Sequence, residues 1–142
     1  MRKRIVLLAL SCFSLLFAVP ARALHAQTVG RLSDKDTPVL VSELRVRLNV
    51  PDTSKAAAPA PARVSDADFN ALIAAAAQAY ADLMDQTSLN EQEACAAQWG
   101  SRDEAGVNLR KETQNRRHNL EWLTNNAGDM LPLLEKYVQT KK

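Results

Sequence analysis

The sequence predicts an all-α protein, a small helical bundle of three to four helices preceded by an extended N-terminal arm that contains one β-strand. Two observations favour this class. From Ser65 onward, apolar residues recur at intervals of three and four, which is the period of an amphipathic helix, and the segments begin with polar residues that cap helices. The region directly before Ser65 is rich in Ala and Pro, a composition typical of a linker. The arm and linker therefore occupy residues 27–64, and the helical domain occupies 65–142.

The first 23 residues predict a secretory signal peptide. Basic residues at positions 2–4 precede an apolar run from Ile5 to Val19, and Pro20 stands before the small-x-small cleavage pattern Ala21–Ala23. A weaker pattern allows cleavage after Ala26, and both sites stay open. The run has fifteen residues, fewer than the roughly 18 that a membrane-spanning helix needs. We therefore expect a periplasmic or secreted protein.

Removal of this signal changes the charge and the cysteine content of the chain. It takes away four of the eighteen basic residues and none of the sixteen acidic ones, which leaves a net charge of −2. Such a chain lacks the positive field that attracts nucleic acid, so we expect no nucleic-acid partner and at most peripheral membrane contact. Cys95 remains as the only cysteine. We expect it to be buried, with pairing to a second molecule as the alternative.

One segment of the arm carries a period of its own. Apolar and polar residues alternate strictly over residues 44–50, which favours a half-buried strand ended by Pro51. A competing interpretation is a helix that starts at Thr37–Pro38 and excludes Val46 from its apolar face. A lone strand needs a partner for its backbone groups, so we hypothesise that residues 42–50 dock on a protein of the cell envelope. The side chains that would make this contact are Leu44, Val46, Leu48 and Val50.

The first two helices of the domain have clear start signals. Ser65 and Asp68 form a capping box, with Asp in place of the usual Glu, for a helix that runs to about Asp85. Its stripe consists of Phe69, Leu72, Ile73, Ala76, Tyr80, Leu83 and Met84. A second box at Ser88 and Glu91 predicts a helix that ends at Gly100, with Leu89, Gln92, Ala96 and Trp99 on one face. The short connection at residues 86–87 predicts that these two helices form an antiparallel hairpin.

Two more helices are expected in the last third of the chain. One runs from Ser101 or Asp103 to Asn126, with Val107, Leu109, Leu120 and Leu123 as its core contacts. The next is capped by Asp129, tolerates Pro132 in its first turn, and presents Met130, Leu133, Leu134, Tyr137 and Val138. Heptad spacing from 109 to 137 leaves an alternative, one long helix kinked at Pro132 with Thr113 and Arg116 in its seam. We favour two helices.

Charges alternate between blocks of the helical domain. Residues 65–93 hold six acidic and no basic residues, whereas residues 102–118 hold five basic and three acidic ones. The favoured interpretation is that the two blocks lie close together and neutralise each other. The alternative is that Arg110, Arg116, Arg117 and neighbouring Lys111 form a patch for an anionic partner, such as a phospholipid head group or an acidic protein.

Motifs for catalysis, cofactor binding and metal binding are not found. One cysteine and one histidine cannot close a zinc site, and there is no glycine-rich phosphate loop. The sequence therefore predicts a non-enzymatic, exported helical protein that acts as an accessory or protein–protein interaction module of the bacterial envelope. Its small core also leaves room for homo-oligomerisation. The alternative is a small hydrolase or thiol enzyme that uses Cys95 and His118.

Overall fold

The structure is a computed structural model that describes residues 30–52 and 64–142. These residues form five α-helices and no strand, which confirms the all-α prediction. The helices are α1 (Thr37–Arg47), α2 (Asp66–Met84), α3 (Gln86–Trp99), α4 (Glu104–Asn125) and α5 (Ala127–Thr140). None of these helices is long and apolar enough to span a bilayer. The predicted signal peptide and most of the Ala/Pro linker lie outside the described residues.

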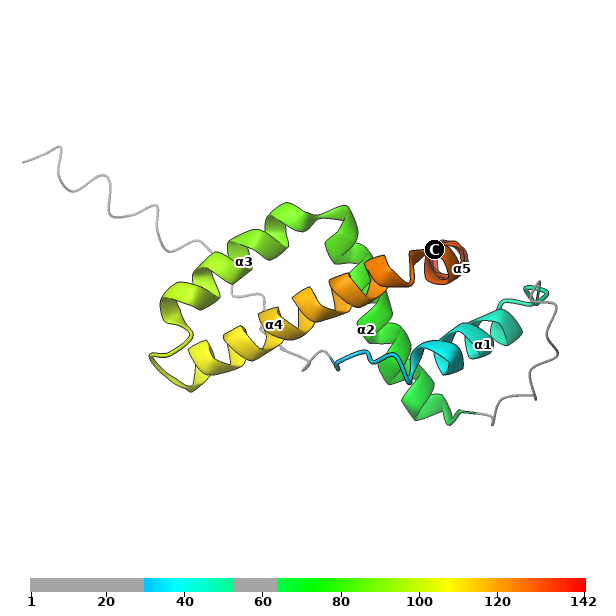
Figure 1. Cartoon of the computed structure of the whole chain (residues 1–142), viewed down its shortest axis with the longest axis horizontal. Helices are drawn as coiled ribbons and strands as arrows, with labels where there is room; N and C mark the ends of the chain where they lie inside the picture. Colours follow the sequence, from blue (N-terminus) through cyan, green and yellow to red (C-terminus); the bar gives the residue numbers. More distant parts are fainter. Residues whose placement is uncertain (1–29, 53–63) are drawn as a thin grey trace, which may run out of the picture.

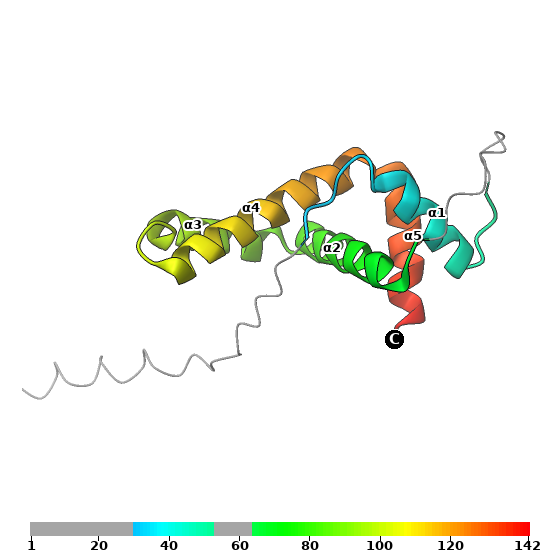
Figure 2. The ribbon, with the colours of Figure 1, turned by 90° about the horizontal axis from the view of Figure 1, so that it is seen from below.

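The molecule has two parts joined by α4. One part packs α1, α2, α5 and the second half of α4 around the main apolar cluster, to which α3 contributes no buried residue. In the other part, α3 and the first half of α4 run antiparallel and project away from that cluster (Figures 1 and 2). We call this projection, α3 with residues 104–117 of α4, the α3–α4 hairpin. Its packing against the rest of the molecule therefore depends on contacts outside the main core.

The strand predicted at residues 44–50 is wrong, because residues 37–47 form α1. The competing helical interpretation describes the structure. Leu40 and Leu44, four residues apart, are both fully buried on the face that packs into the core. Asn49 adopts a positive φ of 51° just after the helix, a conformation that asparagine tolerates, and so ends it. Burial of the i, i+4 leucine pair outweighs the weaker signal of the alternation.

The N-terminal segment, residues 30–36, is bound to α4 and is not a free arm. The Asn119 side chain accepts a hydrogen bond from the Leu32 amide at 2.9 Å and donates one to the Gly30 carbonyl at 2.9 Å. One helical turn further on, the Trp122 indole donates to the Thr37 hydroxyl at 2.8 Å. Leu32 itself is fully buried in the core. The segment predicted as an extended arm is thus attached within the same chain, and its residues 34–36 form a turn before α1.

The start of α2 is as predicted, since the Ser65 hydroxyl accepts a hydrogen bond from the Asp68 amide. The start of α3 differs from the prediction. Asp85 ends α2 and also caps α3, accepting from the Ser88 amide. A single connecting residue cannot carry the chain across the 8–10 Å that separates the axes of packed helices. The predicted antiparallel pairing with α2 is therefore wrong, and α3 turns away to pair with α4 (Figure 1).

The preference for two final helices is confirmed, with the break at Asn126. Asp103 caps α4 through the Gly106 amide at 2.8 Å, one of the two predicted starts. However, α5 begins at Ala127, so Asp129 lies in its first turn and Pro132 lies inside the helix. Of the core contacts predicted for α4, Leu120 and Leu123 are buried, Leu109 is half-buried and Val107 is exposed.

Candidate functional site

A buried ion pair fixes the α3–α4 hairpin to α2. Arg116 of α4 donates to both carboxylate oxygens of Asp82 in α2, with the Nε to Oδ2 bond at 3.0 Å. Gln78 donates to the same carboxylate, and Arg116 also donates to Gln92 of α3. One guanidinium thus connects three helices.

Both charged side chains of this pair are almost completely shielded from solvent. The exposed fraction of Asp82 is 2%, and that of Arg116 is 9%. The hydrogen bonds with Asp82 raise the pKa of Arg116 above its ordinary value, although burial acts in the opposite direction. Within the described residues, every buried side-chain nitrogen and oxygen atom has a hydrogen-bond partner. The pair is therefore fully satisfied, and its geometry determines where the hairpin leaves the core.

A second pair lies on the hairpin surface. Arg117 donates to both carboxylate oxygens of Glu93 in α3, at 2.7 and 2.5 Å, and also to Asn90. The hydrogen bonds from Arg117 lower the pKa of Glu93 below its ordinary value of 4.5, against a smaller opposing effect of burial. This pair joins the two helices of the hairpin to each other, and the nearby charge of Asp82 also acts on Arg117.

The lowered pKa of Glu93 predicts a pH-dependent contribution to stability. A carboxyl group whose pKa is lower in the folded state stabilises the protein above its unfolded pKa, near 4.5, and loses this effect as the pH falls through the folded value. Because the Glu93 side chain is 36% exposed, solvent screens the pair, and we expect less than about 1 kcal/mol. Urea unfolding from about pH 6 to pH 3 should show a smaller loss of stability in Glu93→Gln than in the wild type. An equal loss of stability in Glu93→Gln and in the wild type over this pH range would contradict the prediction.

A close approach of backbones joins the helices at the far end of the hairpin. A Cβ atom on Gly106 would overlap the carbonyl oxygen of Trp99, so the first turn of α4 crosses the end of α3 in direct contact. Leu89 and Ala96 are the buried apolar residues of α3. The hairpin is thus closed by a glycine contact at its far end and by the contacts of Arg116 and Arg117 nearer to α2.

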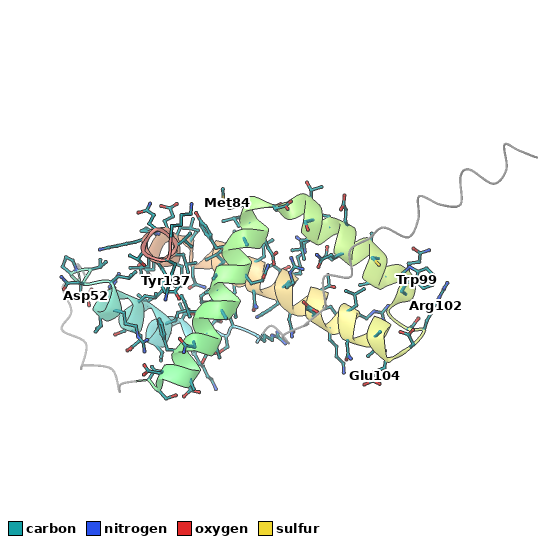
Figure 3. The ribbon with its side chains drawn as sticks, turned by 180° about the vertical axis from the view of Figure 1, so that it is seen from behind. Asp52, Met84, Trp99, Arg102, Glu104 and Tyr137 are labelled. Atoms are coloured by element: carbon teal, nitrogen blue, oxygen red, sulfur yellow. The ribbon has the colours of Figure 1, made fainter. Side chains whose placement is uncertain are left out.

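An exposed group of aromatic, apolar and basic side chains lies at that far end. Trp99 is 45% exposed and Val107 is 38% exposed, two of the four large apolar side chains that are exposed in the described residues. The guanidinium of Arg102 lies 4.0 Å above the Trp99 ring, and both side chains stand at the outer end of the hairpin (Figure 3). Arg110 packs against Gly100, and the next residue, Lys111, is exposed. We call Trp99, Arg102, Val107, Arg110 and Lys111 the hairpin tip.

The residues predicted to bind a partner are divided by the structure. In α1 and the turn after it, Leu44 is a core residue, Leu48 and Val50 are half-buried against the core, and Val46 is 71% exposed. In α4, Arg116 and Arg117 pair with acidic residues of α2 and α3, as the charge-neutralising interpretation describes. Arg110 remains exposed.

Cys95 and His118 are in different surroundings. Cys95 is exposed on α3, so the prediction of a buried thiol is wrong. His118 is half-buried, with Nε2 2.9 Å from the Leu32 carbonyl and Nδ1 3.4 Å from the Arg31 guanidinium. It borders an open cleft of about 400 Å³ between residues 31–34 and α4. In the described ranges, no three His, Cys, Asp or Glu side chains are grouped so that they could hold a metal ion.

Sequence reasoning missed Trp99 as an exposed residue, because its spacing placed it on the apolar face of α3. The sequence also did not indicate that the Arg102 guanidinium stacks on the Trp99 ring. The available signal was the Trp99–Gly100 end of the helix, where a large aromatic residue stands beside a turn. Comparison with known proteins gives no further assignment, since no family model, no curated protein and no solved structure matches the chain.

Proposed function

We propose that the protein is an exported, non-enzymatic helical protein that acts as an accessory or interaction module of the bacterial envelope, with the α3–α4 hairpin as its binding element. The signal-like first 23 residues of the sequence support the export. A protein or surface of the envelope is the expected partner. Oligomerisation through the same element is a second outcome to test.

The observation that carries this proposal is the exposed Trp99 at the end of a projection. Exposing the large apolar ring of tryptophan to water is unfavourable in free energy. Tryptophan and arginine are also enriched at the centres of binding interfaces. Here Trp99 and Arg102 stack on each other at the outer end of a hairpin that is fixed to the core by the Asp82–Arg116 pair. A rigid support with an exposed aromatic end is the arrangement that a binding site requires.

Site-specific photocrosslinking in intact cells tests the binding element. A benzophenone amino acid in place of Trp99 should give a discrete crosslinked product, because that side chain faces the partner. The matched control is the same residue in place of Val46, which is 71% exposed on α1 in the other part of the molecule. Equal products from both positions, or none from position 99, would refute the assignment.

Export is tested on the same cells by mass spectrometry of the isolated protein. We expect a mature N-terminus after Ala23 or Ala26 and recovery from the periplasmic or extracellular fraction. Retention of the intact chain in the cytoplasm would refute the export.

A further inference from the structure

The chemistry of the hairpin tip suggests which surface it binds. We propose that the tip docks on an anionic phospholipid surface, with Trp99 at the interface between head groups and acyl chains and with Arg102, Arg110 and Lys111 against lipid phosphates. This inference rests on the proposed function, because only an exported protein would meet the envelope membranes from outside the cytoplasm.

The first argument is charge. The arginines elsewhere in the helices are paired: Arg45 and Arg47 with acidic residues near α1 and α2, and Arg116 and Arg117 within the hairpin. At the tip, by contrast, Arg102, Arg110 and Lys111 form no ion pair with any described residue. Unpaired cations that share one end of the molecule are complementary to a surface of phosphates.

Nearby carboxylates weaken this charge without cancelling it. Asp103 is committed to capping α4 through the Gly106 amide, and Glu112 adds to the negative potential that raises the pKa of Arg116. Glu104 points outward at the tip (Figure 3). Residues 99–111 hold three basic and two acidic side chains. The next carboxylate, that of Glu112, is half-buried and acts on Arg116, so the excess of charge at the tip is positive.

The second argument is the combination of residue types. Tryptophan is enriched where membrane meets water, since its ring is apolar while its N–H is polar, and basic side chains accompany it there. Trp99 and Val107 supply exposed apolar surface, and Lys111 follows Val107 by one helical turn on the same face of α4. An acidic protein would satisfy the same charges and would also bury the ring, so it is the alternative outcome that the vesicle experiment tests.

Binding to vesicles tests the proposal, with the exported form of the protein isolated after loss of its signal. We expect cosedimentation with phosphatidylglycerol/phosphatidylcholine vesicles and weak binding to pure phosphatidylcholine. The tryptophan emission should shift to shorter wavelength on binding. Trp122 is 3% exposed in the core, so this shift reports on Trp99.

Substitutions assign the binding to the tip. Each basic side chain near an anionic surface contributes about a fivefold change in affinity, so Arg102→Gln, Arg110→Gln and Lys111→Gln together should weaken binding about a hundredfold. The matched control removes three exposed basic residues of the C-terminus, Lys136→Gln, Lys141→Gln and Lys142→Gln, and should bind almost as the wild type. Circular dichroism establishes that both variants are folded.

The outcomes separate this inference from the proposed function. Equal binding of the tip variant and the control variant, or equal binding of the wild type to neutral and anionic vesicles, would overturn the lipid proposal. A protein crosslinked through position 99 without any vesicle binding would also overturn it, while leaving the hairpin as the binding element. Failure to recover an exported form would refute the proposed function itself.

Discussion

Asp82→Ala should destabilise the protein by about 3–5 kcal/mol, because it leaves the Arg116 guanidinium buried without its countercharge. The loss has two sources: the hydrogen bonds of the pair, and the desolvation of an arginine that is 9% exposed in the folded state. Urea unfolding at neutral pH, followed by far-ultraviolet circular dichroism, measures it. The hairpin should lose amide-exchange protection first, since Arg116 connects it to α2.

Two controls establish that the charge, and not the volume, is responsible. Asp66→Ala removes one of the two acidic partners of Arg47, at a site that is 89% exposed, where screening by solvent makes an ion pair contribute little. The double variant Asp82→Leu with Arg116→Met replaces both charges by apolar side chains and should recover most of the lost stability. A double variant no more stable than Asp82→Ala would show that packing around residue 82 dominates.

The sequence predicted the features that depend on neighbouring residues. The cap at Ser65 and the start of α4 at Asp103 follow from side chains that accept hydrogen bonds from amides three residues further on. The break near Asn126 is also local, although the Asn126 side chain donates to the Trp122 carbonyl and does not cap α5. The amphipathic stripe of α2 is equally local, since Phe69, Ile73 and Ala76 share one face by spacing alone.

The features that the sequence did not reveal depend on contacts between distant residues. Asp82 and Arg116 are 34 positions apart, and only the sum of charges in two blocks indicated their proximity. Position 99 was misassigned because helical spacing identifies a face but not which helix covers it. At residues 44–50 a period of two and a period of nearly four share positions 44 and 48, so the pattern alone could not choose between strand and helix.

The sequence did not reveal the attachment of residues 30–36 to α4 either, because this attachment also depends on contacts between distant residues. The main-chain groups of Gly30 and Leu32 form hydrogen bonds with Asn119, almost ninety positions away. Asn119 lies in the most polar helix, so its sequence context does not indicate that its side chain binds a distant segment. The arrangement covers part of that side of α4 with a segment of the same chain.

Leu32→Ala should therefore cost about 2–5 kcal/mol, the range for truncating a leucine in a core. Leu32 is fully buried in the main apolar cluster, and its amide and carbonyl bond to Asn119 and His118. Hydrogen bonds to residues far away in the sequence hold the backbone at Leu32 in place. The cavity that the substitution leaves can therefore collapse only in part. Chemical denaturation of the purified protein measures the loss of stability.

Val46→Ala is the matched comparison, because Val46 is 71% exposed on the neighbouring helix and a surface truncation should change stability by less than about 0.5 kcal/mol. The two substitutions distinguish the two models of the N-terminal region. A free arm that docks on a partner would make both substitutions neutral in the isolated protein, with Val46→Ala reducing partner binding. An attached segment makes Leu32→Ala the costly change, because the alanine leaves a cavity in the main apolar cluster. The Leu32 amide is then protected from hydrogen exchange by its bond to Asn119, whereas in a free arm it exchanges at the rate of an unfolded chain.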